Sequence, residues 1–219
     1  MWMYGRNRSR GADMTGRRSV RMLTRLFAVA AMALAVAVPT VSGAGPVSAD
    51  TGPAPVPRLD LNRYLGRWWQ LAAVPQFFNV VCARDTQAHY SLDPQGNIAV
   101  RNSCITWVNT VNEITGTAVV NDRATGAQLR VSFPGVPTQD NVEGPTNYIV
   151  TALGPDYSWA VVTDPSRVSG FVLAREPVLD DTAWQQIRAA ITAAGQNPCF
   201  YLTSPTTGGD PRIVPLCVR

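Results

Sequence analysis

One histidine and four cysteines are the side chains of this 219-residue sequence best suited to nucleophilic, redox or metal chemistry. His89 is the only histidine, so metal sites built from several histidines are excluded and histidine catalysis is limited to a single dyad. It stands between Ala88 and Tyr90 in a segment that we expect to form a β-strand. We therefore interpret His89 as an ordinary strand residue, either hydrogen-bonded or in contact with water.

The cysteines favour disulfides over catalysis. All four lie after residue 49, in the part of the chain that we expect to be exported, and none forms a Cys-x-x-Cys pair. An even number of cysteines in an oxidising compartment favours two disulfides over a free nucleophilic thiol. Three connectivities are open, and we favour the pairing that is local in sequence, Cys82 with Cys104 and Cys199 with Cys217.

Other patterns that carry chemistry are missing from the sequence. No glycine-rich phosphate loop and no paired-carboxylate motif stands out, and the glycines fall in turn-like stretches between apolar segments. We therefore predict a protein that is not an enzyme and that uses no cofactor and no metal ion.

Residues 1–49 have the pattern of a signal peptide. Seven arginines precede an apolar run at 26–38, whose 13 residues are fewer than the roughly 20 that span a bilayer. Small side chains at 47–49 then suit signal peptidase, so we place cleavage after Ala49. No cysteine lies near this position, so we expect a secreted or cell-envelope protein without a lipid anchor. A membrane anchor or a buried helix is the alternative, and Arg17-Arg18 leaves twin-arginine export open.

Removal of this leader reverses the sign of the protein's charge. The full sequence carries a net charge of +4, but seven of its arginines lie in residues 1–49. The remaining part has 12 arginines, no lysine and 14 carboxylates, which gives a net charge of −2. Because these arginines are scattered along the chain, we expect no nucleic-acid partner.

The exported part reads as a series of short strands. Segments rich in β-branched and aromatic residues follow a helical turn at 60–64, and hairpin-length stretches rich in Gly, Pro, Asp and Asn separate them. Such even spacing favours an up-and-down barrel, because closure removes the exposed edges of a sheet. The eight predicted strands are 67–74, 86–92, 98–107, 113–120, 128–133, 147–153, 159–163 and 170–174.

The predicted class is all-β: an eight-stranded antiparallel up-and-down β-barrel with one C-terminal α-helix packed outside. The helix covers 181–194, with Asp180 as its cap. The first strand is apolar on both faces, so we expect the helix to cover Trp69 and Leu71. We place a flexible lead-in at 50–58 and a single domain at 59–219.

Residues 62–69, Asn-Arg-Tyr-Leu-Gly-Arg-Trp-Trp, resemble the segment that opens the first strand of the lipocalin family with Gly-x-Trp. Thr163-Asp164 and Arg175 stand at the relative positions of the two other segments that the family shares. The resemblance covers about residues 59–203 and is strongest to bacterial lipocalins and apolipoprotein D. One departure is the sequence Thr-Asp-Pro where the family commonly has Thr-Asp-Tyr.

The resemblance also implies how one end of the barrel is closed. In the family the arginine lies across the indole of the Gly-x-Trp tryptophan, and a cation over an aromatic face is a favourable contact. Carried over, Arg175 covers Trp68, and Gly66, Thr163 and Asp164 complete the barrel-closing motif.

The function implied is that of a carrier or scavenger, which holds a small hydrophobic or amphipathic ligand such as a fatty acid or lysophospholipid. Phe77 and Phe78 are expected on the loop over the barrel mouth, where the ligand must enter. We expect a monomer or weak dimer, with only transient contact with a membrane surface. Strand alternation and the resemblance together place these side chains in the lumen: Gln70, Ala72, Leu129, Val131, Phe133 and Tyr148.

Two other functions stay open on this scaffold. A few lipocalin-like proteins isomerise or de-epoxidise their ligands, which here would rest on acids such as Asp85 or Glu113, or on a free cysteine. Alternatively, the loops at the barrel mouth, 134–145 above all, could bind another protein.

The resemblance also implies an alternative disulfide pairing. Some animal lipocalins link the cysteine that corresponds to Cys82 to the C-terminal tail.

Overall fold

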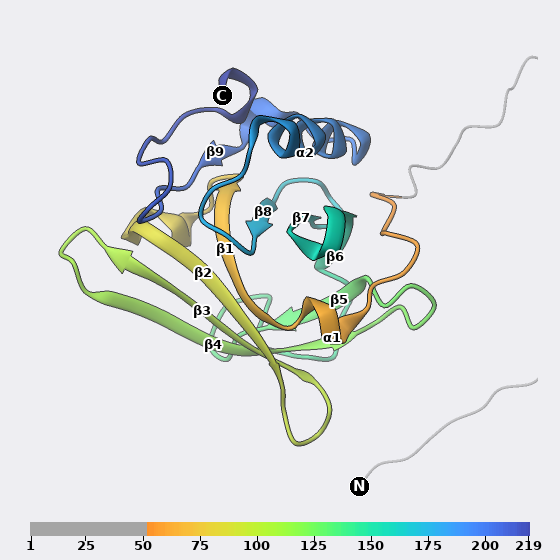
Figure 1. The fold of residues 1–219 in the computed structure, drawn as a ribbon. Helices are drawn as coiled ribbons and strands as arrows, with labels where there is room; N and C mark the ends of the chain where they lie inside the picture. The colour runs from red at the N-terminus through yellow and green to blue at the C-terminus, as the bar shows by residue number, and fades with distance from the viewer. Residues whose placement is uncertain (1–51) are drawn as a thin grey trace, which may run out of the picture. The chain divides into compact units, whose positions relative to one another are not determined.

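Eight antiparallel strands close into a β-barrel at the centre of the structure (Figure 1). The computed structural model describes residues 52–219, so the predicted signal peptide lies outside the described residues. Strand β1 (Gly66–Ala73) pairs with β8 on one side and with β2 on the other, which confirms the predicted up-and-down barrel. Within residues 52–219, no helix has both the length and the apolar character needed to cross a membrane.

The elements agree with the predicted ones to within a few residues. The largest difference is β2, which begins at Cys82 because its first residues pair with β3 on either side of a bulge near Asp85. After β1 the barrel strands are β2 (Cys82–Leu92), β3 (Ile98–Thr106), β4 (Val111–Val120), β5 (Gln128–Ser132), β6 (Tyr148–Leu153), β7 (Trp159–Thr163) and β8 (Gly170–Ala174). Outside them lie α1 (Leu61–Tyr64), α2 (Asp181–Ala193), β9 (Leu202–Thr203) and the short helical turns η1 (Phe77–Val81), η2 (Pro155–Tyr157), η3 (Pro198–Phe200) and η4 (Leu216–Val218).

Helix α2 packs on the outside of the barrel, as predicted. Asp180 caps it by accepting a hydrogen bond from the Ala183 N–H at 2.7 Å. The helix turns one apolar side toward the barrel, and Ile187 on that side has no exposed surface. Leu71 of β1 belongs to the same buried cluster as this side of the helix, and the partly buried Trp69 packs against that cluster, so the outer face of the strand is covered. We call this layer the outer cluster: Leu71, Ala72, Trp159, Val161, Val172, Ala174, Trp184, Ile187, Ile191, Tyr201 and Leu216.

A bulge in β1 changes which side chains face the lumen. Gln70 pairs with Leu173 and Ala72 pairs with Val172, so Leu71 is an extra residue in the strand. Both Leu71 and Ala72 therefore point outward into the outer cluster. The prediction that Ala72 lines the lumen is wrong, because it assumed uninterrupted alternation along β1. Ala73 takes the inner position instead, opposite Phe171.

The segment after α2 returns to the barrel and adds a ninth strand. Strand β9 pairs with the end of β1, and the Ser204 N–H donates to the Leu71 carbonyl at 2.8 Å. Both predicted disulfides are present, Cys82–Cys104 between β2 and β3 and Cys199–Cys217 within the C-terminal segment. The sequence-local connectivity is thus confirmed over the alternative to the tail.

Residues 52–58, expected as a flexible lead-in, run along the barrel. The Val56 N–H donates to the Val150 carbonyl at 2.8 Å, and Val56 is buried. The Leu59 N–H likewise donates to the Thr125 carbonyl at 2.7 Å. This part of the lead-in therefore packs with the domain, because Val56 finds an apolar site beside β6.

The strand register distinguishes the two ends of the barrel. Helix α1, the start of β1 and the β2–β3 hairpin lie at one end, because Gly66 pairs with Tyr90. The end of β1 lies beside the start of β8, where the Val74 N–H donates to the Gly170 carbonyl. We call the first the closed end and the second the open end. The open end thus carries η1 and the β3–β4, β5–β6 and β7–β8 connections.

Candidate functional site

Trp68 and Arg175 seal the closed end. Trp68 has no exposed surface, and its indole N–H donates to the Tyr64 carbonyl at 2.8 Å. The Arg175 guanidinium lies 3.7 Å from the centre of the Trp68 ring. It also donates to the carbonyls of Arg67 at 2.8 Å and Arg63 at 2.6 Å. The guanidinium is thus held by a cation–π contact and two charge-assisted hydrogen bonds, as the resemblance implied for these two residues.

Gly66 fits closely beneath this arginine. Its φ of +93° lies in the region that glycine adopts most readily, and a Cβ atom at this position would come within 3.4 Å of Arg175 Nη1. The glycine of the Gly-x-Trp segment therefore lets the chain turn into β1 while Arg175 approaches the backbone.

Thr163 and Asp164 do not take part in this closure. They stand at the turn between β7 and β8, which is at the open end. Asp164 accepts hydrogen bonds from the N–H groups of Ser166 and Ser169, and the Thr163 hydroxyl donates to the Ser169 carbonyl at 2.9 Å. Their role in the structure is to shape that turn. The expectation that they help to close the barrel is wrong. The direction of β7 places them at the open end, whereas Trp68 lies at the closed end.

The turn that does reach the closed end is η2, between β6 and β7. The Tyr157 hydroxyl accepts from the Asp60 N–H at 2.8 Å, and the Arg63 guanidinium lies 4.4 Å from the centre of the Tyr157 ring. Arg63 also pairs with Asp156 at 3.3 Å. The segment at 163–165 reads Thr-Asp-Pro and lacks the Asp-Tyr pair that is common in the family. That pair is present in η2 as Asp156-Tyr157. That pair was the signal in the sequence that could have identified this turn.

Above Trp68, three tyrosine side chains meet inside the barrel. The Tyr148 hydroxyl lies 2.7 Å from that of Tyr64 and 3.2 Å from that of Tyr90. The rings of Tyr64 and Tyr90 are stacked, with their centres 5.7 Å apart. Burial raises the pKa of all three phenols, that of Tyr90 to about 12. Only Tyr148 was among the predicted site residues.

The predicted lumen residues of β5 and β6 do come together on the inner side. Leu129 belongs to the inner cluster, which also contains Trp68, Tyr90, Val150 and Val162. Val131, Phe133 and Tyr148 pack against it while staying only partly buried. Gly116 of β4 makes room for Phe133, because a Cβ atom there would come within 2.6 Å of the Phe133 ring. The inner wall is thus apolar, and part of it remains accessible.

At the open end lies a cavity of about 230 Å³. Gln70 contributes to its wall and donates from Nε2 to the Ser204 hydroxyl at 2.9 Å, as a buried amide should. Of the predicted lumen residues, Gln70 alone lies on this wall, and those of β5 and β6 do not reach it. Residues that the sequence analysis did not single out form the rest, including Ala73, Thr86 and Trp107. Thr86 could have been found by continuing the alternation back from Tyr90 and Ala88.

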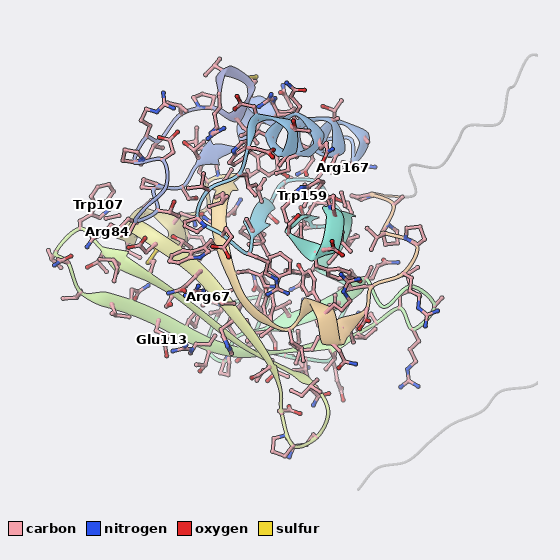
Figure 2. All side chains as sticks on the ribbon, viewed as in Figure 1. Arg67, Arg84, Trp107, Glu113, Trp159 and Arg167 are labelled. Atoms are coloured by element: carbon pink, nitrogen blue, oxygen red, sulfur yellow. A yellow bond between two sulfur atoms is a disulfide. The ribbon has the colours of Figure 1, made fainter. Side chains whose placement is uncertain are left out.

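Phe77 and Phe78 lie on η1, next to this opening. Their rings meet edge to face at 5.4 Å, and the two side chains are 78% and 44% exposed. They stand outside the wall of the open-end cavity, whose η1 residues are Asn79 and Val80. The Trp107 indole donates to the Val80 carbonyl at 2.8 Å, which ties the β3–β4 turn to η1. Trp107 and Arg84 lie close together at this end (Figure 2).

The remaining reactive side chains are engaged elsewhere. His89 is exposed on the outer face, between Arg67 and Arg101 on the neighbouring strands. Glu113 pairs with Arg101 at 3.2 Å. Asp85 accepts hydrogen bonds from the backbone and hydroxyl of Thr207 at 2.6 and 2.8 Å. All four cysteines are in disulfides, so none supplies a thiolate.

An eight-stranded barrel sealed by a tryptophan under an arginine, with one helix outside, defines a lipocalin. The chain matches the family model for the lipocalin-like domain over residues 59–202, well over half of its length. It therefore belongs to the lipocalin family.

Curated relatives agree with this assignment. Temperature-induced lipocalin-1 of Arabidopsis thaliana is 33% identical over 131 residues, which are 59% of this chain and 69% of that protein. The outer membrane lipoprotein Blc of Escherichia coli K12 is 31% identical over 145 residues, 64% of this chain and 75% of that protein. Apolipoprotein D of Mus musculus is 27% identical over 140 residues, 62% of this chain and 71% of that protein.

Solved structures show the same fold. Insecticyanin from the tobacco hornworm Manduca sexta has a TM-score of 0.55 at 16% identity, covering 71% of this chain and 86% of that one. The allergen Per a 4 from cockroaches has a TM-score of 0.53 at 19% identity, covering 73% of this chain and 97% of that one.

Proposed function

We propose that this lipocalin is an exported carrier or scavenger of a small hydrophobic or amphipathic molecule, such as a fatty acid or lysophospholipid, and that it has no catalytic activity. The observation that carries the proposal is the contrast between the two barrel ends. Trp68 and Arg175 seal one end. Partly buried apolar side chains such as Val131 and Phe133 line the inner wall, and a cavity of about 230 Å³ with Gln70 on its wall lies at the other end. Such a site takes up apolar ligands because each buried CH₂ group contributes about 0.8 kcal/mol.

One relative supports the same proposal, since the name of apolipoprotein D describes a protein component of lipid–protein particles. We place the ligand against Gln70, Leu129, Val131, Phe133 and Tyr148. Ala72 is not included, because it lies in the outer cluster.

A matched pair of substitutions on β4 tests the lumen. Ile114 lies on the inner face opposite Asn102 and is 39% exposed, whereas the next residue, Thr115, is exposed on the outer face. Ile114→Trp should block the lumen and abolish saturable binding of a fluorescent fatty acid, while Thr115→Trp should bind like the wild-type protein. Native mass spectrometry of protein purified without detergent should show bound lipid. A wild-type barrel that is empty and gives no saturable signal contradicts the proposal.

The ligand is proposed to enter past Phe77 and Phe78, from a lipid bilayer that this end of the molecule touches. Neither η1 nor the stretch from Ile105 to Asn112 contains a charged residue. Several of their apolar side chains are exposed, among them Val80 at 71% and Val108 at 79%. Aromatic and aliphatic side chains without charge next to a lumen are suited to the interfacial region of a membrane.

Vesicle sedimentation tests this contact. The double variant Phe77→Ser/Val108→Ser should reduce binding to phosphatidylcholine vesicles and slow the transfer of fatty acid from them. Val178→Ser is the control, because Val178 is 59% exposed but lies between β8 and α2. Equal vesicle binding by the wild-type protein and both variants rules out this docking surface.

Export is proposed from the leader together with the two disulfides, which persist in oxidising compartments. The mature protein should begin at Asp50. Mass determination of the protein recovered from the culture medium or envelope checks this, and an intact N-terminus at Met1 contradicts it.

A further inference from the structure

Two buried phenols, Tyr64 and Tyr90, and the partly buried phenol of Tyr148 share two hydrogen bonds, which leaves one proton without an acceptor among the described residues. Tyr148 bonds to both Tyr64 and Tyr90, and these are the only hydrogen bonds that join the three hydroxyls. Each hydroxyl has one proton to donate. Whichever way the protons point, one O–H of the trio therefore lacks an acceptor among residues 52–219.

Two of the three phenols lie in a dry part of the protein. Tyr64 is 3% exposed and Tyr90 is 8% exposed, and burial raises the pKa of both phenols, so they stay protonated donors. Buried donors are almost always paired, and leaving one unpaired is unfavourable. The tyrosine trio therefore offers a hydrogen bond to any oxygen that reaches it from the lumen.

Asn102, on the same inner wall, has a hydrogen-bond acceptor that lacks a donor within the described part of the chain. Its side-chain oxygen is buried and has no hydrogen-bond donor among residues 52–219. Asn102 pairs with Ala88 and Val100 pairs with Tyr90, so Asn102 is a diagonal neighbour of Tyr90 on the inner face. Diagonal neighbours in a sheet are about 7–8 Å apart, within reach of one small group between long side chains.

The side chains around the tyrosine trio favour a neutral hydroxyl of the ligand over a carboxylate. Tyr90 pairs with Gly66 and Val100, and Tyr148 pairs with Leu129, so none of these cross-strand neighbours is charged. The nearby cation, Arg175, lies against Trp68 and is already bonded to two backbone carbonyls. A carboxylate here would lose its hydration without a counter-ion, and it could not donate to Asn102. A neutral hydroxyl accepts from a phenol and donates to the amide oxygen.

We propose that Tyr64, Tyr90, Tyr148 and Asn102 form a polar subsite deep in the lumen, which binds the hydroxyl group of a neutral amphipathic ligand such as a long-chain alcohol or sterol. This inference rests on the proposed carrier function and narrows its ligand class. The hydroxyl points toward the closed end, and the apolar part of the ligand extends past Val131 and Phe133 toward the open end.

A series of ligands that differ only in the end group tests the subsite. A long-chain alcohol, the carboxylate and the alkane of the same length compete with a fluorescent apolar probe for the full mature protein. The alcohol should bind about 3- to 10-fold more tightly than the alkane, as expected for one or two net hydrogen bonds, and more tightly than the carboxylate.

Variants then assign the effect to these residues. Tyr148→Phe and Asn102→Leu should each remove most of the advantage of the alcohol while leaving alkane binding unchanged. Tyr157→Phe is the matched control, because its hydroxyl bonds to the Asp60 N–H outside the lumen. Thermal unfolding confirms that each variant is folded, and Tyr90→Phe replaces any variant that is not.

The outcomes separate this subsite from the carrier function. If the three ligands bind equally, or the carboxylate binds best, the subsite is disproved while the carrier function stands. Equal loss of all three ligands in Tyr148→Phe shows a merely structural role and also overturns the subsite. If no ligand displaces the probe and the probe itself does not bind, the carrier function fails as well.

Discussion

Among single residues, Arg175 makes a large contribution to the stability of the closed end. It combines a cation–π contact with Trp68 and hydrogen bonds to two backbone carbonyls that close the barrel's end. Arg67 makes a superficially similar contact, 5.0 Å from the Trp69 ring, but its side chain is exposed. Exposed cation contacts contribute less, because water screens them.

Replacement of Arg175 should therefore be costly. We expect Arg175→Met to lower the free energy of unfolding by about 2–3 kcal/mol, since it removes charged hydrogen bonds as well as the cation–π contact. Arg175→Lys should recover only part of this, because an ammonium cannot reproduce the planar fork. Urea unfolding measures both, with Arg67→Met as a control that changes stability by less than about 1 kcal/mol. Equal effects at 175 and 67 contradict this account of the closed end.

The tyrosine trio predicts a pH dependence. The folded pKa of each phenol is raised above its unfolded value of 10.0 by burial, with that of Tyr90 at about 12. Stability is therefore complete below about pH 10 and falls as the pH rises through about 12, because the unfolded chain loses protons first. Urea midpoints at neutral and alkaline pH should show this loss. Tyr148→Phe should show a smaller loss, and an unchanged pH profile in this variant contradicts the assignment.

At the level of elements, α2 and the outer face of the barrel stabilise each other. The helix contacts β6 and β7 and buries Trp184, Ile187 and Ile191 in the outer cluster, to which the bulge of β1 adds Ala72. The same bulge turns Ala73 inward. One local irregularity thus serves both the outer cluster and the lumen wall.

Truncation on this helix should separate core from surface. Ile187→Ala is expected to cost about 2–5 kcal/mol, because Ile187 has no exposed surface and its removal leaves a cavity. Gln186→Ala, on the exposed side, should change stability by less than about 0.5 kcal/mol. Thermal and urea unfolding provide the comparison. A small effect at 187 would mean that α2 does not depend on the barrel for its stability.

The two disulfides should contribute similarly to stability. Their sequence separations of 22 and 18 predict a loss of about 3 kcal/mol on removal of either one. Both also shape the open-end cavity, because Cys82 lines it and the loop closed by Cys199–Cys217 contributes Ser204 and Ile213 to its wall. Cys82→Ser/Cys104→Ser and Cys199→Ser/Cys217→Ser should therefore each weaken ligand binding. Calorimetry and ligand titration on both variants test this, and unchanged binding in either one contradicts it.

For the whole molecule, a ligand that binds only the folded barrel must raise its apparent stability. At a ligand concentration 100 times Kd the gain is about 2.7 kcal/mol. The midpoint of thermal unfolding should therefore rise with added ligand in the wild-type protein and in Thr115→Trp, but not in Ile114→Trp. A midpoint that does not respond in the wild-type protein would show that the lumen holds no ligand under these conditions.

Much of the molecule is determined locally by its sequence. Strand alternation, turn residues and the Asp180 cap predicted the barrel and its outer helix to within a few residues. Cysteine spacing favoured the correct disulfides. These features depend on side chains that are close in sequence, so the pattern alone was sufficient, whereas the role of Trp68 beneath Arg175 came from the resemblance of the Gly-x-Trp segment to the lipocalin family.

Only the tertiary structure determined the features that depend on the register between strands distant in sequence. The bulge that moved Ala72 outward is visible only in the pairing of β1 with β8. Thr163 and Trp68 lie at different ends of the barrel, because the direction of each strand determines the end at which its last residue stands. The hydroxyls of Tyr64 and Tyr148 meet across 84 residues of sequence. Only the closed barrel brings such groups together, because closure fixes every strand against two neighbours at once.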